Sequence, residues 1–134
     1  MRILRLLILL GIVVSGCSNA KEAYKSLGDL QQLHADLTTK YKEELSLNIN
    51  NDKYLSISII NSKLNELPIE QKKQKAREIA VYAVGSYKNS NELETVSVGY
   101  VIHKSYIIIN YTEAMEQYRF NVSELKNSDS NRAI

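Results

Sequence analysis

The stretch Leu45-Ser-Leu-Asn-Ile-Asn-Asn-Asp-Lys-Tyr-Leu-Ser-Ile-Ser-Ile59 decides the fold class of this chain. Apolar and polar residues alternate on both sides of its centre, and strict alternation is typical of strands with one buried face. Asn and Asp tolerate the left-handed backbone of tight turns, so residues 50–53 are expected to connect the two strands. The pattern therefore predicts a β-hairpin whose leucines and isoleucines share one face.

The segments before and after this hairpin show helical periodicity. Residues 18–44 carry apolar side chains at spacings of three and four, and the charged residues between them, including Asp29, are expected to face solvent. After a loop at 61–67, Pro68 fits the first position of a second helix that runs to Tyr87. The first helix is expected to cover a sheet. A seam for a partner helix and a loose tether above a membrane are the alternatives.

Alternation returns in the last third of the chain. Residues 94–102 are expected to form a strand, followed by a tight connection at 103–105 and an apolar strand over 106–111 that is covered on both faces. Residues 117–122 are expected to form a further strand, and the polar residues 126–134 are expected to be frayed. The chain is therefore predicted to be α+β: an N-terminal helix, a β-hairpin, a helix, and an antiparallel two- or three-stranded meander, forming one sheet covered by helices.

The first residues are organised differently. Arg2 and Arg5 precede an apolar run from Leu6 to Val14, which is far shorter than the roughly 20 residues that a membrane-spanning helix needs. A basic start, a short apolar run and small residues after it are the layout of a secretory signal. A cleaved leader is therefore expected at this end of the chain.

The run ends in Val14-Ser15-Gly16-Cys17, which contains the one cysteine of the chain. These four residues resemble the lipobox of bacterial lipoprotein precursors. The resemblance implies cleavage between Gly16 and Cys17, a diacylglyceryl group on the Cys17 sulfur, and acylation of the new N-terminus, with palmitate as a typical chain. Several acyl chains make a lasting membrane anchor, whereas one holds a protein only reversibly. A plain cleaved signal and an uncleaved start are the alternatives.

Three segments follow from these patterns: a lipoprotein signal peptide at 1–16, a single α+β domain at 17–125 and a tail at 126–134. The expected location is the cell envelope, with the protein attached to a bacterial membrane through the lipid on Cys17. In Gram-negative lipoproteins, a residue other than Asp after the cysteine, here Ser18, accompanies sorting to the outer membrane. Beyond the lipobox, the domain resembles small bacterial lipoproteins to which no characterised activity is attached.

The net charge of the chain argues against a nucleic-acid partner. The chain has 134 residues, the size of one domain, with 17 Lys and Arg against 15 Asp and Glu. Removal of Arg2 and Arg5 with the signal leaves 15 of each sign, so the mature domain is neutral. Nucleic-acid binding relies on a clustered positive surplus, and none is expected here. The basic cluster at 72–77 is expected to be a solvated helix face, with a phosphate or headgroup patch as the alternative.

The residues that carry chemistry are few. His34 lies on the apolar stripe of the first helix, where a boundary position with a satisfied hydrogen bond is expected, and His103 lies at the predicted turn. Two isolated histidines without a nearby cluster of Asp, Glu or Cys do not predict a metal site. The five glycines form no phosphate-binding loop. We therefore predict no catalytic residue, no cofactor and no metal, and a protein that is not an enzyme.

Nine tyrosines against one phenylalanine make an unusual aromatic composition. Four of them lie on adjacent predicted strands: Tyr100, Tyr106, Tyr111 and Tyr118. Packing within the sheet is one interpretation, since tyrosine favours strands; a ligand-facing surface is the other. The leading functional prediction is a lipid-anchored envelope protein that acts as a protein-interaction or structural module with another envelope protein. The alternative is a glycan- or peptide-binding module that uses the tyrosine-bearing sheet face.

Overall fold

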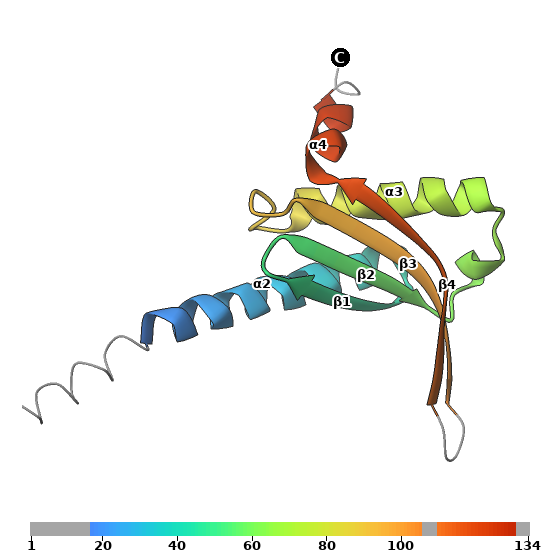
Figure 1. Ribbon diagram of the computed structural model, residues 1–134, viewed down its shortest axis with the longest axis horizontal. Coiled ribbons are helices and arrows are strands. Elements are labelled where there is room, and N and C mark those ends of the chain that lie inside the picture. Colours follow the sequence, from blue (N-terminus) through green and yellow to red (C-terminus); the bar gives the residue numbers. More distant parts are fainter. Residues whose placement is uncertain (1–16, 106–109, 131–134) are drawn as a thin grey trace, which may run out of the picture.

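Two hairpins, two long helices and a short C-terminal helix make up the fold (Figure 1). The computed structural model describes residues 17–105 and 110–130. The elements, in chain order, are α2 (Cys17–Tyr41), β1 (Glu44–Asn50), β2 (Tyr54–Ile60), the 3-10 helix η1 (Lys63–Glu66), α3 (Ile69–Ser86), β3 (Thr95–Ser105), β4 (Asn110–Asn121) and α4 (Val122–Ser130). The class is α+β, as the sequence predicts.

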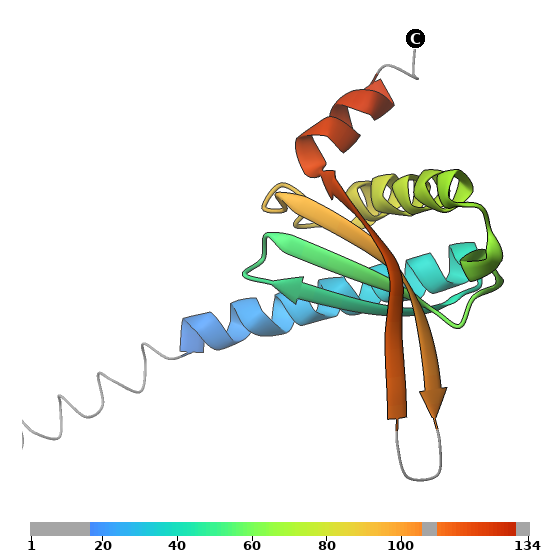
Figure 2. The same cartoon turned by 45° about the vertical axis from the view of Figure 1, so that its right-hand side comes forward.

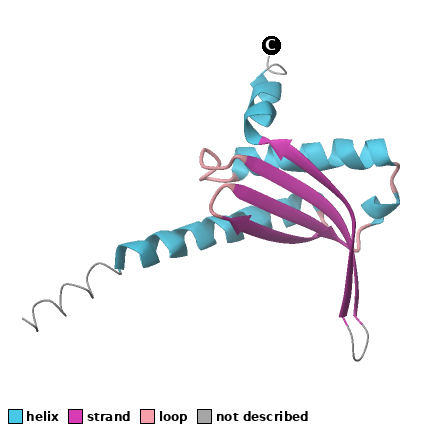
Figure 3. Cartoon of the chain, in the orientation of Figure 1, coloured by secondary structure: helices cyan, strands magenta, loops and turns pink. Residues whose placement is uncertain are grey.

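The four strands form one sheet in the order β1-β2-β3-β4 (Figure 3). Strands β1 and β2 pair antiparallel, which confirms the predicted first hairpin. Strands β3 and β4 also pair antiparallel, so the predicted meander has two strands, and the further strand expected at 117–122 is the second half of β4. Strands β2 and β3 pair parallel, so the sheet is mixed. The parallel junction follows from α3, because a helical crossover returns the chain to the end of the sheet from which β2 started.

The first hairpin has the predicted register and turn. Leu47 lies opposite Ile57, so the alternating apolar residues of both strands share one face. Asn51 and Asp52 have φ angles of 51° and 57°, the left-handed conformation that these residue types adopt at low cost. Because both requirements are local in sequence, this part of the fold is encoded directly in residues 45–59.

The second hairpin is longer than predicted. Strand β3 continues to Ser105, where the sequence indicated a turn at 103–105, and His103 lies opposite Thr112 in β4. Beyond a register shift at Tyr100/Val101, β3 and β4 leave the sheet as a two-stranded ribbon (Figure 2). Both polar and apolar residues are tolerated in such a ribbon, which explains why alternation failed to indicate its extent.

The prediction of a central strand over 106–111 is also wrong where the structure tests it. Asn110 and Tyr111 begin β4, which is an edge strand of the sheet. Residues 106–109 lie outside the described residues. An apolar run alone therefore did not distinguish a covered strand from one end of an edge strand.

Helices α2 and α3 pack on one face of the sheet (Figure 2). The core between them consists of fully buried aliphatic residues and alanines, with Leu33 and Leu37 from α2, Leu55, Ile57 and Ile59 from β2, Ala76, Ile79, Ala80 and Ala83 from α3, and Val96 and Val98 from β3. Burial of each large aliphatic side chain stabilises the fold by about 1.5–3 kcal/mol. The alanines keep α3 close to the sheet.

Helix α2 differs from the prediction at two points. It ends at Tyr41 rather than residue 44, because Lys42 adopts a φ of 55° and donates its N–H to the Thr38 carbonyl, a helix-terminating geometry. Asp29, expected to face solvent, is only 7% exposed, and its Oδ1 lies 3.0 Å from the Lys88 ammonium group. The cation after α3 compensates a carboxylate that helical periodicity alone assigns to the surface.

The segment predicted as a frayed tail contains an ordered helix. Helix α4 extends over Val122–Ser130, and Leu125 is 1% exposed. The Asn121 side chain caps this helix by accepting a hydrogen bond from the Ser123 N–H at 3.0 Å. The tail prediction is therefore wrong for residues 126–130, whereas residues 131–134 lie outside the described residues.

Candidate functional site: a groove between α3 and β4

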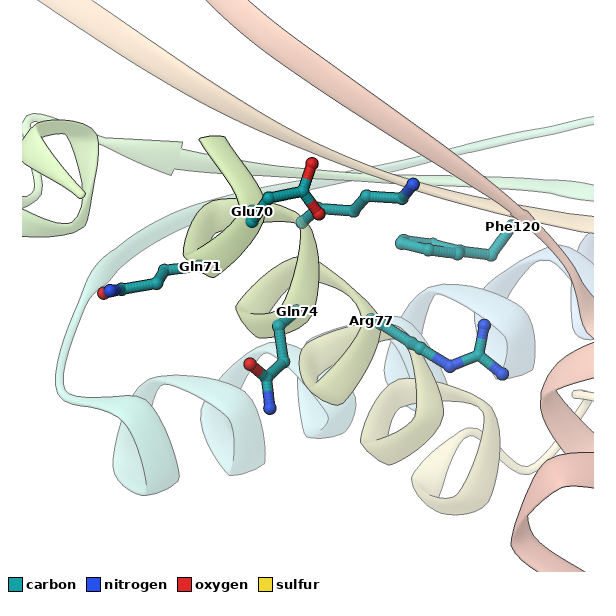
Figure 4. A pocket seen from close by; sticks show the side chains of 6 residues that line it. Glu70, Gln71, Gln74, Arg77 and Phe120 are labelled. Atoms are coloured by element: carbon teal, nitrogen blue, oxygen red, sulfur yellow. The ribbon is translucent and has the colours of Figure 1, made fainter. Parts of the chain in front are cut away.

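A surface groove of about 360 Å³ lies between α3 and the edge strand β4 (Figure 4). Five of its lining residues come from α3 and one comes from β4: Glu70, Gln71, Lys73, Gln74, Arg77 and Phe120. The groove is open to solvent, and it therefore differs from the enclosed pockets in which small molecules are usually held.

Helical spacing places the α3 residues of the groove on one stripe. Lys73, Gln74 and Arg77 lie three, four and seven residues after Glu70, so the four side chains share a face. The neighbouring stripe of α3, which contains Ala76, packs on the sheet. The helix therefore anchors one side to the core and presents a polar side along the groove.

The charge of the groove is mainly positive. Lys73 and Arg77 make no salt bridge with any residue in the described ranges, and Glu70 is the one carboxylate among the lining residues. Lys75, by contrast, contacts Glu78 at 2.6 Å on the same helix. The groove therefore offers two cations whose charge is available to a ligand.

Phe120 supplies the apolar surface of the groove. It lies opposite Val96 in the register of β3 and β4, on the sheet face that the helices cover, and it packs at the margin of the core. Because no further strand follows β4 in the sheet, the ring is only partly covered. A partly exposed aromatic ring beside an arginine is typical of the anchor points of protein interfaces.

A polar cluster fixes the end of the groove at the start of α3. The Lys72 ammonium group lies 3.2 Å from Glu116 Oε1, and the Tyr118 hydroxyl donates to Glu116 Oε2 at 2.7 Å. Tyr100 donates its hydroxyl to the Lys72 carbonyl at 2.8 Å. These contacts connect the first turn of α3 to both β3 and β4, so they hold one wall of the groove in place.

The cluster changes the acidity of its members. The Tyr118 hydroxyl, followed by the Lys72 ammonium group, holds the pKa of Glu116 below its usual value. Burial raises the pKa of Tyr100 to about 12, with a further contribution from the negative charge of Glu116. The carboxylate is therefore ionised and the tyrosine protonated at neutral pH, which is the state that the hydrogen bonds require.

The buried position of Lys72 contradicts part of the prediction for the basic cluster at 72–77. The sequence indicated a solvated helix face, yet Lys72 is 5% exposed and its ammonium group lies 5.9 Å from the centre of the Tyr100 ring. Lys73 and Arg77 face the groove instead. The cations of this cluster are therefore divided among a partly buried ion pair at Lys72, a helix-surface pair at Lys75, and the groove, which Lys73 and Arg77 face.

The structure does not support the predicted tyrosine-lined ligand surface. Tyr100 is fully buried and packs edge-on against Tyr118, with ring centroids 6.1 Å apart, under α3. Tyr111 lies opposite Lys104 in β4, and Tyr106 lies outside the described residues. Alternation indicates which residues share a face, but it does not indicate whether a helix covers that face. The ligand-facing prediction is therefore wrong for Tyr100.

The two histidines occupy structural positions. His34 Nε2 lies 2.9 Å from the Leu45 carbonyl, which confirms the expected boundary histidine with a hydrogen bond. His103 is exposed, and its Nδ1 lies 2.9 Å from the Thr112 hydroxyl, although it belongs to β3 rather than to a turn. Within residues 17–105 and 110–130, no group of three or more His, Cys, Asp or Glu side chains is arranged to bind a metal ion.

Most of the predicted anchor region lies outside the described residues. Val14, Ser15 and Gly16 lie outside the described residues, and Cys17 is the first residue of α2. In the part of the chain that the structure describes, no helix is long and apolar enough to cross a membrane. The lipid on Cys17 therefore remains a prediction from the lipobox.

Sequence reasoning missed the groove because its parts are distant in the chain. Phe120 lies more than forty residues from Arg77, and only the position of β4 at the sheet edge brings them together. A local signal was available on one side. The repeat of polar residues at 70, 73, 74 and 77 beside an alanine-rich stripe indicates a helix face that is not used for the core.

No family model, no curated protein and no solved structure matches the chain. The function is therefore argued from the lipobox and from the groove.

Proposed function

We propose that this chain is a lipid-anchored protein of the bacterial cell envelope that binds a partner protein through the groove between α3 and β4, without catalysing a reaction. The observation that carries the binding role is the position of Lys73 and Arg77, which form no salt bridge within the described residues, beside the exposed part of Phe120. The lipobox at Val14–Cys17 supports the location.

The course of α2 is compatible with attachment at its first residue. The first half of this helix extends beyond the sheet, and Leu27 is 52% exposed there (Figure 1). At 1.5 Å per residue, the helical rise from Cys17 to Leu30 is about 20 Å. A lipid on Cys17 would thus hold the sheet and α3 away from the bilayer surface, which leaves the groove accessible to a partner.

A protein segment suits this groove better than a small molecule does. The groove is open to solvent, and its lining combines one aromatic ring, two cations, the carboxylate of Glu70 and the amides of Gln71 and Gln74. Arginine and aromatic residues dominate the binding energy of protein interfaces, whereas small ligands are usually surrounded on most of their surface. The tyrosine-bearing face of the alternative glycan hypothesis is covered by α3.

The anchor is tested by Cys17→Ala with Ser18→Ala as the control. Cys17→Ala is expected to move the protein from the membrane fraction to the soluble fraction of lysed cells, because no thiol remains to carry the lipid. Ser18→Ala is expected to stay with the membranes. Membrane association of Cys17→Ala that resists high salt would contradict the proposed anchor.

The binding role is tested by purifying the detergent-solubilised protein from cross-linked cells. The double variant Lys73→Gln/Arg77→Gln is expected to lose its co-purifying partner. The double variant Lys63→Gln/Lys104→Gln removes the same charge from exposed sites outside the groove and is expected to retain it. Equal recovery of one partner with both variants would contradict binding through the groove.

A further inference from the structure

We propose that the groove accepts an extended acidic segment of the partner, which pairs with the free edge of β4 as a fifth strand of the sheet. The inference rests on the proposed function and specifies the chemistry and the binding mode of the partner. Two observations carry it: the backbone groups of β4 that point away from the sheet, and the charge on both sides of that edge.

The hydrogen bond from the Val122 N–H to the Glu94 carbonyl, at 3.0 Å, sets the pattern of the β4 edge. In an antiparallel pair, opposite residues alternate between a hydrogen-bonded and a non-hydrogen-bonded arrangement. Counting back from Val122, the backbone groups of Phe120 and Tyr118 face β3. Those of Arg119 and Gln117 therefore point to the free edge, where two N–H and two C=O groups can pair with another strand.

A fifth strand in this position would place alternate side chains in the groove. Neighbouring strands lie about 4.8 Å apart, and their side chains alternate between the two faces of the sheet. On the inner face, side chains of the added strand would lie between Phe120 and α3, within reach of Lys73 and Arg77. On the outer face they would lie beside Arg119, which is exposed.

The charges at this edge favour an acidic segment. Lys73 and Arg77 on the inner side and Arg119 on the outer side make no salt bridge with any described residue, against the single carboxylate of Glu70. Carboxylates on both faces of the added strand would therefore meet these cations, and arginine binds a carboxylate through two parallel hydrogen bonds. An alternating apolar residue would cover Phe120.

The structure also limits the length of the segment. At one end, the register shift at Tyr100/Val101 bends β3 and β4 away from the sheet, next to the Glu116 cluster. At the other end, α4 begins directly after Asn121. The regular edge of β4 between these limits is Gln117–Asn121, so the added strand would pair over about five residues.

The opposite edge of the sheet provides an internal comparison. On β1, the Leu45 carbonyl points outward and is already bonded to His34. By the same alternation, the N–H groups of Leu47 and Ile49 point to the β1 edge, which has none of the groove cations beside it. An acidic strand is therefore expected to select β4 over β1.

The test uses the full chain, labelled with ¹⁵N and held in detergent micelles, and two synthetic octapeptides: a Glu-Val peptide that repeats Glu-Glu-Val-Glu twice and a Lys-Val peptide that repeats Lys-Lys-Val-Lys twice. In an extended Glu-Val peptide of this kind, one face carries Glu and Val in turn and the other carries Glu alone, so both faces offer carboxylates. We expect the Glu-Val peptide to slow hydrogen exchange of the Gln117 and Arg119 amides by at least about tenfold at saturation. The Leu47 and Ile49 amides should be unaffected. A Glu-Val peptide that is N-methylated at every residue should give no protection, because neither of its edges can donate to the β4 carbonyls.

Variants separate edge pairing from a simple charge effect. Lys73→Gln/Arg77→Gln should weaken binding of the Glu-Val peptide by about tenfold or more, whereas Lys63→Gln/Lys104→Gln should leave it within about twofold. Binding without protection of Gln117 and Arg119, protection of β1 instead, equal binding of the Lys-Val peptide, or no binding at about 1 mM would each overturn the inference. If the co-purifying partner still depends on Lys73 and Arg77 in that case, the proposed function stands and only the strand-pairing mode is wrong.

Discussion

The Tyr100 hydroxyl gives a quantitative test of how the sheet and α3 are held together. Its hydrogen bond to the Lys72 carbonyl, 2.8 Å long, is buried, and Tyr100→Phe removes it without creating a large cavity. A neutral hydrogen bond of this kind contributes about 1 kcal/mol to stability. For a domain of this size, that corresponds to a decrease in Tm of about 4 °C. Tyr54→Phe is the matched control, because Tyr54 is 44% exposed and its contact with Glu94 is 3.4 Å long.

Urea unfolding followed by circular dichroism measures both variants. Tyr100→Phe is expected to lower the free energy of unfolding by about 1 kcal/mol with an unchanged m-value, and Tyr54→Phe by less than about 0.3 kcal/mol. Equal stabilities of the two variants would contradict a stabilising contribution from the buried hydrogen bond between Tyr100 and the Lys72 carbonyl.

Two further variants test the C-terminal helix and the polar cluster. Leu125→Ala should destabilise the protein by about 2–3 kcal/mol in the same assay, because Leu125 is 1% exposed, and Leu27→Ala should change stability little; a neutral Leu125→Ala would contradict the packing of α4 against the core. The pKa of Glu116 is lowered in the fold, so its contribution to stability is complete above its usual pKa of about 4.5 and is lost as the pH falls through the lowered value. Glu116→Gln should therefore reduce the loss of stability between pH 5 and pH 3 that unfolding curves show for the unmodified protein; identical pH profiles would contradict the ionised cluster.

The first hairpin and α3 were predictable because their determinants are local. The turn at Asn51 and Asp52 needs only residue types that tolerate a left-handed backbone, and the alternation on either side fixes which residues share a face. Pro68 likewise marks the start of α3. No information from distant parts of the chain is needed for these elements.

The C-terminal helix was missed although a local signal was present. Asn121 is followed three residues later by Glu124, the spacing of an N-cap residue and the glutamate of a capping box. The polar composition after Lys126 favours a frayed tail and obscures this pattern. A buried leucine such as Leu125 is expected in a helix that packs against the core and is not expected in a polar tail.

The burial of the tyrosines and the position of the groove both depend on tertiary structure. Strand alternation correctly groups Tyr100 with Tyr118, but the α3 crossover decides that this face is buried. The same crossover places Lys73 and Arg77 along the edge of β4, next to Phe120. Neither result can be derived from periodicity, because periodicity defines faces and does not define their partners.

Site-specific photo-cross-linking in intact cells tests most directly whether the groove is the binding surface. A benzophenone amino acid is introduced at Gln74, which lines the groove, or at Ser58, which lies on the sheet face opposite the helices. The account predicts one discrete cross-linked product from position 74 that disappears when Lys73 and Arg77 are replaced by Gln, and none from position 58. A product from position 58 alone, or the same product from both positions, would contradict it.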